Sequence, residues 1–102
     1  MMVVNENLIY DAALARWGHD RQMLKTIERC GALAGALCRF LSQGQNMRQV
    51  CQTVADMEIM LAQLRLNGLA AMIDDEKVRK LDALSQRLLT QPPATINTGD
   101  KA

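Results

Sequence analysis

Few side chains in this sequence have a type and spacing suited to chemistry. Lys25 and Arg29 stand four residues apart, so on a helix their cationic groups lie one turn apart on the same face. Two cations placed in this way can form a cradle for an anionic group such as phosphate. His19 is the one histidine in the sequence. Because no second histidine or cysteine stands at ligand spacing, a solvated residue at a helix start is favoured over a catalytic base or metal ligand.

The three cysteines include no CxxC motif. Cys30 and Cys38 are predicted to lie on one helix, about 12 Å apart along its axis, which is beyond disulfide reach. We therefore expect Cys30, Cys38 and Cys51 to be reduced, small core residues. Cys30 is the thiol whose reactivity merits a test.

Apolar residues at spacings of three and four predict the helices that must position these side chains. Four helices are expected, over about residues 6–16, 20–41, 46–66 and 74–88. Gly18 predicts a bend between the first two. Each helix has an apolar stripe that we expect to be buried. The stripes are Leu8, Ala12 and Ala15; Leu24, Ile27, Gly31, Ala34, Leu37, Cys38 and Leu41; Met47, Val50, Val54, Met57, Leu61 and Leu64; and Val78, Leu81, Leu84 and Leu88.

Local signals predict where two of these helices begin or end. Asn46 followed by Gln49 resembles a capping box at the start of the third helix. The Asn-Gly pair at 67–68 is a stop signal for that helix. Asp74 and Asp75 can cap the fourth helix, where acidic groups suit the helix dipole.

Composition favours an all-α fold, since hydrophobic residues make up 49% of the chain and aromatic residues only 3%. We expect a single helical domain over residues 1–90 that forms a small four-helix bundle with two long antiparallel central helices. Residues 91–102 contain two prolines and are expected to form a disordered tail. The core is small, so we expect a homo-oligomer, a dimer or higher.

Charge and hydropathy exclude several classes of protein. The formal net charge is +1, which does not indicate an electrostatic nucleic-acid or membrane binder. The apolar stretch between Arg29 and Arg39, residues 30–38, has no charged residue but is too short to cross a bilayer, and no basic segment precedes an apolar run at the start. We therefore expect a cytoplasmic protein.

Three segments are specific in combination. They read RWGHDRQ at 16–22, IERCGAL at 27–33 and VADMEIMLAQL at 54–64. In this order they resemble the MazG-like family of all-α nucleoside triphosphate pyrophosphohydrolases, in its short single-domain form, over roughly residues 10–88. Family members carry a WGxxxQ segment, an EExxE motif on one long helix and an ExxD motif on the next. The resemblance implies acids that hold Mg²⁺, which activates water to release a nucleoside monophosphate and pyrophosphate.

The two acidic motifs are degenerate in this chain. Where the family has EExxE, the sequence reads ERCGA from Glu28, and where the family has ExxD it reads TVAD ending at Asp56. Glu28 and Asp56 are the remnant motif acids, to which the resemblance assigns the catalytic and metal-binding roles. Substrate phosphates can complete the shell of an Mg²⁺ that has only one or two carboxylates. However, Arg29 beside the metal would cost about 4 kcal/mol for each unit charge pair at about 4 Å, so we expect the metal site to be lost and the fold kept.

The resemblance also implies substrate-binding residues. Trp17 and Gln22 would lie at the nucleobase end, where an indole stacks and an amide reads base edges; alternatively Trp17 plugs the end of the bundle. Arg29 has two interpretations. It forms a structural ion pair with a remaining acid, Asp56 or Glu28, or it joins Lys25 in binding phosphate where the metal stood.

A basic last helix leaves a similar choice open. Its cations form either a solvated face or further contacts to ligand phosphates, and Lys80 is the one assigned here to substrate binding. These cations are Lys77, Arg79, Lys80 and Arg87.

The leading functional prediction is a MazG-like homologue that is catalytically silent or impaired. Such a protein retains a nucleotide or anion pocket, or binds a protein partner. Because short family members are frequently carried by phages, the resemblance extends to a counter-defence role. One alternative is an active pyrophosphohydrolase with a reduced site and Mg²⁺ as its cofactor, and another is a purely structural helical adaptor.

Overall fold

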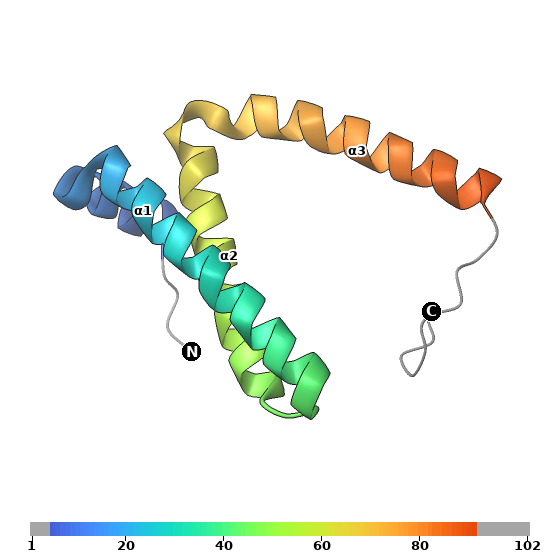
Figure 1. Cartoon of the computed structure of the whole chain (residues 1–102). Coiled ribbons are helices and arrows are strands. Elements are labelled where there is room, and N and C mark those ends of the chain that lie inside the picture. Colours follow the sequence, from blue (N-terminus) through green and yellow to red (C-terminus); the bar gives the residue numbers. More distant parts are fainter. Residues whose placement is uncertain (1–4, 92–102) are drawn as a thin grey trace. The chain divides into compact units, whose positions relative to one another are not determined.

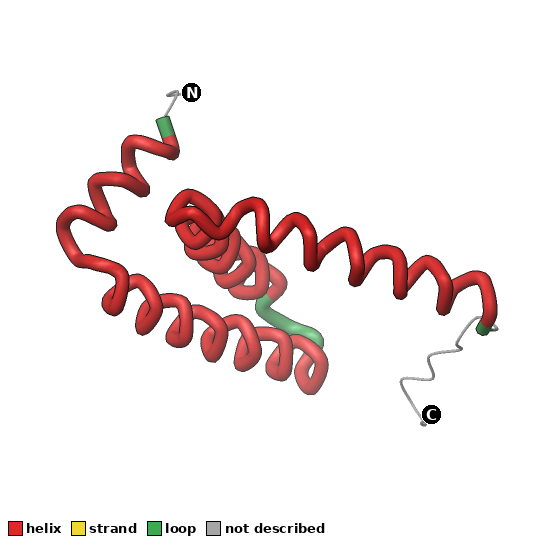
Figure 2. The backbone as a smooth tube through the Cα atoms, turned by 90° about the horizontal axis from the view of Figure 1, so that it is seen from above, coloured by secondary structure: helices red, strands yellow, loops and turns green. Residues whose placement is uncertain are grey.

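The computed structural model describes residues 5–91, and these residues are helical apart from short connections, with no strand among them (Figure 2). The elements are α1 (Glu6–Gln43), α2 (Met47–Leu64), a π-helical turn η1 (Arg65–Leu69) and α3 (Ala70–Thr90). The all-α prediction is confirmed. The predicted disordered tail lies outside the described residues except for Gln91. The chain divides into two compact units, with the boundary after Ala70.

Glycine and asparagine set the bounds of α1. The side chain of Asn5 caps its start by accepting a hydrogen bond from the backbone N–H of Leu8 at 3.2 Å. Its end is closed by Gly44, which has φ 66° and donates its N–H to the carbonyl of Phe40 at 2.7 Å. Inside α1, Gly18 has φ 82° and ψ 169°, a conformation that essentially only glycine adopts. The predicted bend at Gly18 is confirmed.

The start of α2 differs from the prediction. Asn46 has φ 66° and its side chain makes no capping hydrogen bond, so the expected capping box with Gln49 is wrong. A side-chain cap requires extended backbone at that position, whereas Asn46 is left-handed. Gln49 instead accepts hydrogen bonds from Arg39 Nε at 3.1 Å and Nη2 at 3.0 Å, which joins the start of α2 to the end of α1.

The Asn-Gly pair at 67–68 breaks the helical path, as its stop signal predicts. Gly68 has φ 96° and Asn67 has ψ 19°, and both lie in η1, after which α3 begins at Ala70. Asp74 and Asp75 therefore lie inside α3, and their predicted capping role is wrong. The non-helical angles of Asn67 and Gly68 form a kink, and the next helix begins at Ala70, before the aspartates.

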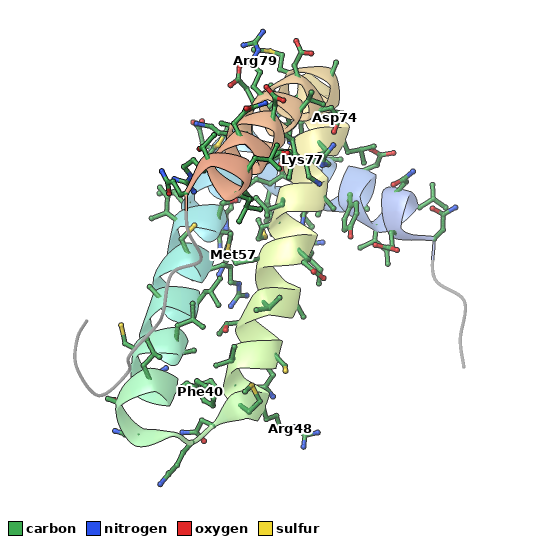
Figure 3. All side chains as sticks on the ribbon, turned by 90° about the vertical axis from the view of Figure 1, so that its right-hand side faces the viewer. Phe40, Arg48, Met57, Asp74, Lys77 and Arg79 are labelled. Atoms are coloured by element: carbon green, nitrogen blue, oxygen red, sulfur yellow. The ribbon has the colours of Figure 1, made fainter. Side chains whose placement is uncertain are left out.

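In the first unit, α1 and α2 form an antiparallel hairpin (Figure 1). Side-chain contacts join Gln22 to Gln63 and Arg29 to Asp56, so residues later in α1 meet residues earlier in α2. Phe40 on α1 lies near the loop end of the hairpin, as does Arg48 on α2 (Figure 3). The packing of α1 on α2 thus holds the segments at 16–30 and 53–64 against each other.

The predicted buried stripes are largely exposed, and this is the main correction to the sequence reading. On α1, Leu24 is 63% exposed, Ile27 67% and Leu41 81%. The buried residues are instead half polar, with two amides and one hydroxyl-bearing threonine, and one of the others is a small alanine. They are Tyr10, Gln22, Ala36, Thr53, Met60 and Gln63. Helix periodicity identifies an apolar face, but here α1 and α2 meet along a different face, which carries the Gln22–Gln63 hydrogen bond and the Arg29–Asp56 ion pair.

The cysteines follow the same pattern. Cys30, Cys38 and Cys51 are all exposed with free thiols, so the prediction that they are core residues is wrong. Cys38 belongs to the uncovered stripe of α1, and its exposure has the same cause.

The second unit contains α3, which has no buried residue among those described. The helix packing that the first unit shows joins two helices rather than four, so the structure does not show the expected four-helix bundle. None of the helices in residues 5–91 is both long and apolar enough to cross a membrane.

Candidate functional site

A cavity of about 300 Å³ opens between α1 and α2. Three cationic side chains line it from one face of α1, at intervals of four residues: Arg21, Lys25 and Arg29. The remaining lining comprises two amides and three less polar side chains: Gln22, Gln63, Ala13, Trp17 and Met60. The cavity therefore combines a positive edge with an aromatic ring and amide groups, a combination that suits a ring-bearing anion.

Each of two cations at the cavity is paired with one of the remnant acids. Arg29 Nη1 lies 3.7 Å from Asp56 Oδ2, and Lys25 Nζ lies 3.4 Å from Glu28 Oε1. The Arg29 and Asp56 side chains are each 40% exposed, so their pair contributes at most about 1 kcal/mol to stability. A ligand anion can displace such carboxylates at little cost.

The amides at the cavity are held in place from both helices. Gln22 Nε2 donates to Gln63 Oε1, and Asn67 Nδ2 donates to Gln22 Oε1 at 2.6 Å. Gln22 is only 5% exposed and Gln63 only 8% exposed. These two side chains therefore present fixed hydrogen-bonding groups where a ligand would enter.

Trp17 lies just before the break at Gly18. Its side chain is 55% exposed, so the described residues do not enclose it as a plug. The guanidinium carbon of Arg16 lies 6.0 Å from the ring centroid, which is cation–π distance. The indole is thus positioned at the cavity with much of its surface open to stacking.

The residues at the former motifs do not fit Mg²⁺ well. Glu28 and Asp56 each face a cation, and no group of three or more potential metal ligands occurs within residues 5–91. Thr53 stands where the motif would have its first acid, and its hydroxyl donates to backbone carbonyls of Gln49 and Val50 at 3.0 and 2.9 Å. The chemistry of this donor set is that of ion pairing rather than of a divalent metal site.

The structure brings together four of the predicted substrate-binding residues along one cavity. Trp17, Gln22, Lys25 and Arg29 all line the cavity. Lys80 lies on α3, in the second unit, and is described with that helix alone.

Sequence reasoning missed four of the cavity residues, of which two, Arg21 and Gln63, are polar. Arg21 precedes Lys25 by four residues and Arg29 by eight, so the helical spacing that linked the two predicted cations also includes it. Gln63 is a polar residue three positions after Met60, inside an otherwise apolar run. Its role follows from the hydrogen bond that it accepts from Gln22 across the hairpin, which the sequence alone does not show.

Comparisons with family models, curated proteins and solved structures found no match.

Proposed function

We propose that this chain is a MazG-like relative that binds a nucleotide polyphosphate in the cavity between α1 and α2 and is catalytically silent or impaired. The indole of Trp17 would stack on the base, while Lys25 and Arg29 bind phosphate oxygens. Arg21, on the same helix face, adds a third cation at the cavity edge.

The observation that carries this proposal is the pairing of two cavity cations with exposed acids. Asp56 and Glu28 neutralise Arg29 and Lys25 through contacts of 3.7 and 3.4 Å. A polyphosphate offers the guanidinium a bidentate partner with more charge than one carboxylate. Ligand binding would therefore exchange weak, solvated pairs for stronger ones.

Isothermal titration in a metal-free buffer tests the proposal. The probes are inorganic tripolyphosphate and a panel of nucleoside triphosphates. Arg29→Gln should weaken binding by about tenfold or more, because a hydrogen bond to a charged group contributes about 1.5–3 kcal/mol. Arg48→Gln removes the same charge from an exposed position of α2 and serves as the matched control. Absence of binding to the wild-type protein would contradict the proposal.

The Asp56→Asn variant separates the proposed pocket from an enzyme with a reduced site. In the pocket Asp56 competes with the ligand for Arg29, so the variant should bind triphosphates up to about fivefold more tightly. In an active pyrophosphohydrolase the same variant would lose pyrophosphate release in the presence of Mg²⁺ or Mn²⁺. If the chain shows no triphosphate binding and no turnover, these results favour a structural helical adaptor that engages a protein target.

Partner binding belongs to the same proposal, and we infer that the partner is a second copy of the chain. Among the described residues the buried hydrophobic side chains are only Tyr10, Ala36 and Met60, which is too small a core for an independent fold. The stripe of α1 that includes Leu24, Ile27 and Leu41 is exposed and unbroken by charge. Association of copies through this stripe would remove it from water.

Light scattering after size-exclusion chromatography tests this association. The wild-type chain should elute as a dimer or larger, and Ile27→Asp should shift it toward the monomer because a charge would be buried in the interface. Asn7→Asp, at an exposed position of α1 outside the stripe, is the control. A monomeric wild-type chain would contradict association.

A further inference from the structure

A chain of three amides with one direction runs through the hairpin. Asn67 in η1 donates to Gln22 in α1, and Gln22 donates to Gln63 in α2. Gln63 Nε2 then donates to the thioether sulfur of Met60 at 3.8 Å. Each amide therefore donates to the next group along the chain, and the chain ends on a weak acceptor, the Met60 sulfur.

The end of this chain is under-satisfied and lies at the cavity. Gln63 Nε2 carries two N–H groups, and the acceptor that the described residues provide is the Met60 sulfur alone. The Gln63 side chain is 8% exposed, so water reaches it poorly. Both Gln63 and Met60 line the cavity. A ligand with a hydrogen-bond acceptor would satisfy this amide better than sulfur does.

We propose that Gln63 selects the ring of the bound ligand by donating from Nε2 to a ring carbonyl oxygen, so that keto-bearing rings bind in preference to amino-bearing rings. The inference rests on the proposed function, since it concerns the ring attached to the polyphosphate that Lys25 and Arg29 bind. It adds a determinant of ring specificity to the site.

The direction of the chain explains why an amino group would be rejected. An amino group at the same position would face Gln63 Nε2 as donor against donor. Reversal of Gln63 alone would oppose donor to donor with Gln22. Reversal of all three amides would place the Gln63 carbonyl oxygen against the Met60 sulfur, so that two acceptors meet. Met60 therefore fixes the polarity of the amides from one end.

Uridine and cytidine triphosphates are the sharpest pair of probes. Their rings share one carbonyl oxygen and differ at another position, where uracil has a carbonyl oxygen and cytosine an amino group, with the adjacent ring nitrogen changing from donor to acceptor; their phosphates are the same. In metal-free titration the wild-type chain should bind UTP about tenfold more tightly than CTP, the size expected when one buried polar group loses its partner. Inorganic tripolyphosphate, which has no ring, measures the phosphate contribution separately.

Two variants at the amide chain sharpen the test. Gln63→Glu keeps an acceptor for Gln22 but removes the donor, so the ratio of UTP to CTP affinity should fall to about one even if the added charge weakens both. Gln52→Glu, at an exposed position of the same helix, adds the same charge and should keep the wild-type ratio. Met60→Leu conserves the volume and removes the sulfur that fixes the polarity of the amides, so the ratio of UTP to CTP affinity should fall. Circular dichroism spectra of the variants, compared with that of the wild-type chain, serve as the control for folding.

The outcomes separate this inference from the function on which it rests. If tripolyphosphate binds in an Arg29-dependent manner but UTP and CTP bind equally, ring selection is overturned and the anion pocket stands. The same holds if Gln63→Glu retains the wild-type ratio, or if CTP binds more tightly than UTP. If tripolyphosphate and all the triphosphates fail to bind, both proposals are overturned.

Discussion

The α1–α2 hairpin and α3 have similar apolar periodicity but differ in what they bury. The hairpin has six buried residues, whereas α3 has none among the described residues. The difference does not follow from hydrophobicity, because α3 carries Val78, Leu81, Leu84 and Leu88 at helical spacing. Within the hairpin, the burial goes with contacts between α1 and α2, which include the Gln22–Gln63 hydrogen bond.

The hairpin itself has two distinct faces on α1. One face provides Gln22 and Ala36 to the contact with α2, and the other presents the stripe that includes Ile27 and Leu41 to solvent. The more apolar face is thus the uncovered one. An amphipathic pattern therefore identifies a helix face that is apolar, but it does not identify the surface that packs against that face.

The largest expected effect compares a core residue of the hairpin with a residue of α3. Met60 is 8% exposed and Leu81 is 55% exposed. Met60→Ala should lower the free energy of unfolding by about 2–5 kcal/mol, whereas Leu81→Ala should change it by about 0.5 kcal/mol or less. Urea denaturation followed by circular dichroism measures both. An equal loss from the two variants would show that α3 is covered in solution.

A smaller effect compares two glycines of α1. Gly18→Ala should lower the free energy of unfolding by about 1–3 kcal/mol, because φ 82° with ψ 169° is strained for any residue with a side chain. Gly31 lies in regular helix with nothing within 4 Å of an added Cβ. Gly31→Ala should therefore raise stability by about 0.5–1 kcal/mol. A loss at Gly31 would indicate another helix against the stripe.

Next in size is the polar contact at the loop end of the hairpin. Gln49→Ala removes the acceptor for two Arg39 donors and should lower the free energy of unfolding by about 1 kcal/mol. Thermal unfolding of this variant can be compared with that of Gln45→Ala, which alters an exposed residue of the loop. Equal melting temperatures for the two variants would contradict a stabilising role for Gln49.

The smallest effect concerns the single tyrosine. The hydroxyl of Tyr10 donates to Glu6 Oε1 at 2.9 Å, and this bond, with burial and the nearby negative charge, raises the pKa of Tyr10 above 10.0. The protonated form is favoured in the folded state, so this stabilisation is present below pH 10.0 and is lost as pH rises through the higher folded pKa. Glu6→Ala should bring the pKa of Tyr10 closer to 10.0, as measured by ultraviolet absorbance titration. Asp11→Asn removes a neighbouring carboxylate that is not the acceptor, and an equal fall there would contradict the assignment to Glu6.

Sequence reasoning predicted the helical class and the break at Gly18, because both depend on local properties. Helix spacing follows from the types of residues in sequence, and the conformation of Gly18 is one that side chains disfavour. The capping roles of Asn46, Asp74 and Asp75 were wrong, since a cap depends on a backbone angle that neighbouring turns determine. Asn46 became left-handed, and both aspartates fell inside α3.

Prediction of the candidate site had a different limit. Trp17, Gln22, Lys25 and Arg29 were selected from motif resemblance and helical spacing, and they lie along one cavity. Gln63 was not selected because a glutamine in an apolar run has no local signal of its donor and acceptor partners. Its hydrogen bonds depend on how α2 packs on α1, which the pattern of either helix alone does not specify.

Trp17 has a practical consequence for anyone who studies this chain. It is the one tryptophan in the sequence, and it lines the cavity. Its fluorescence emission therefore reports from that one place, so quenching or a wavelength change on addition of a compound would be a label-free signal of occupancy. Trp17 can therefore serve as an intrinsic fluorescent probe of the cavity without any change to the sequence.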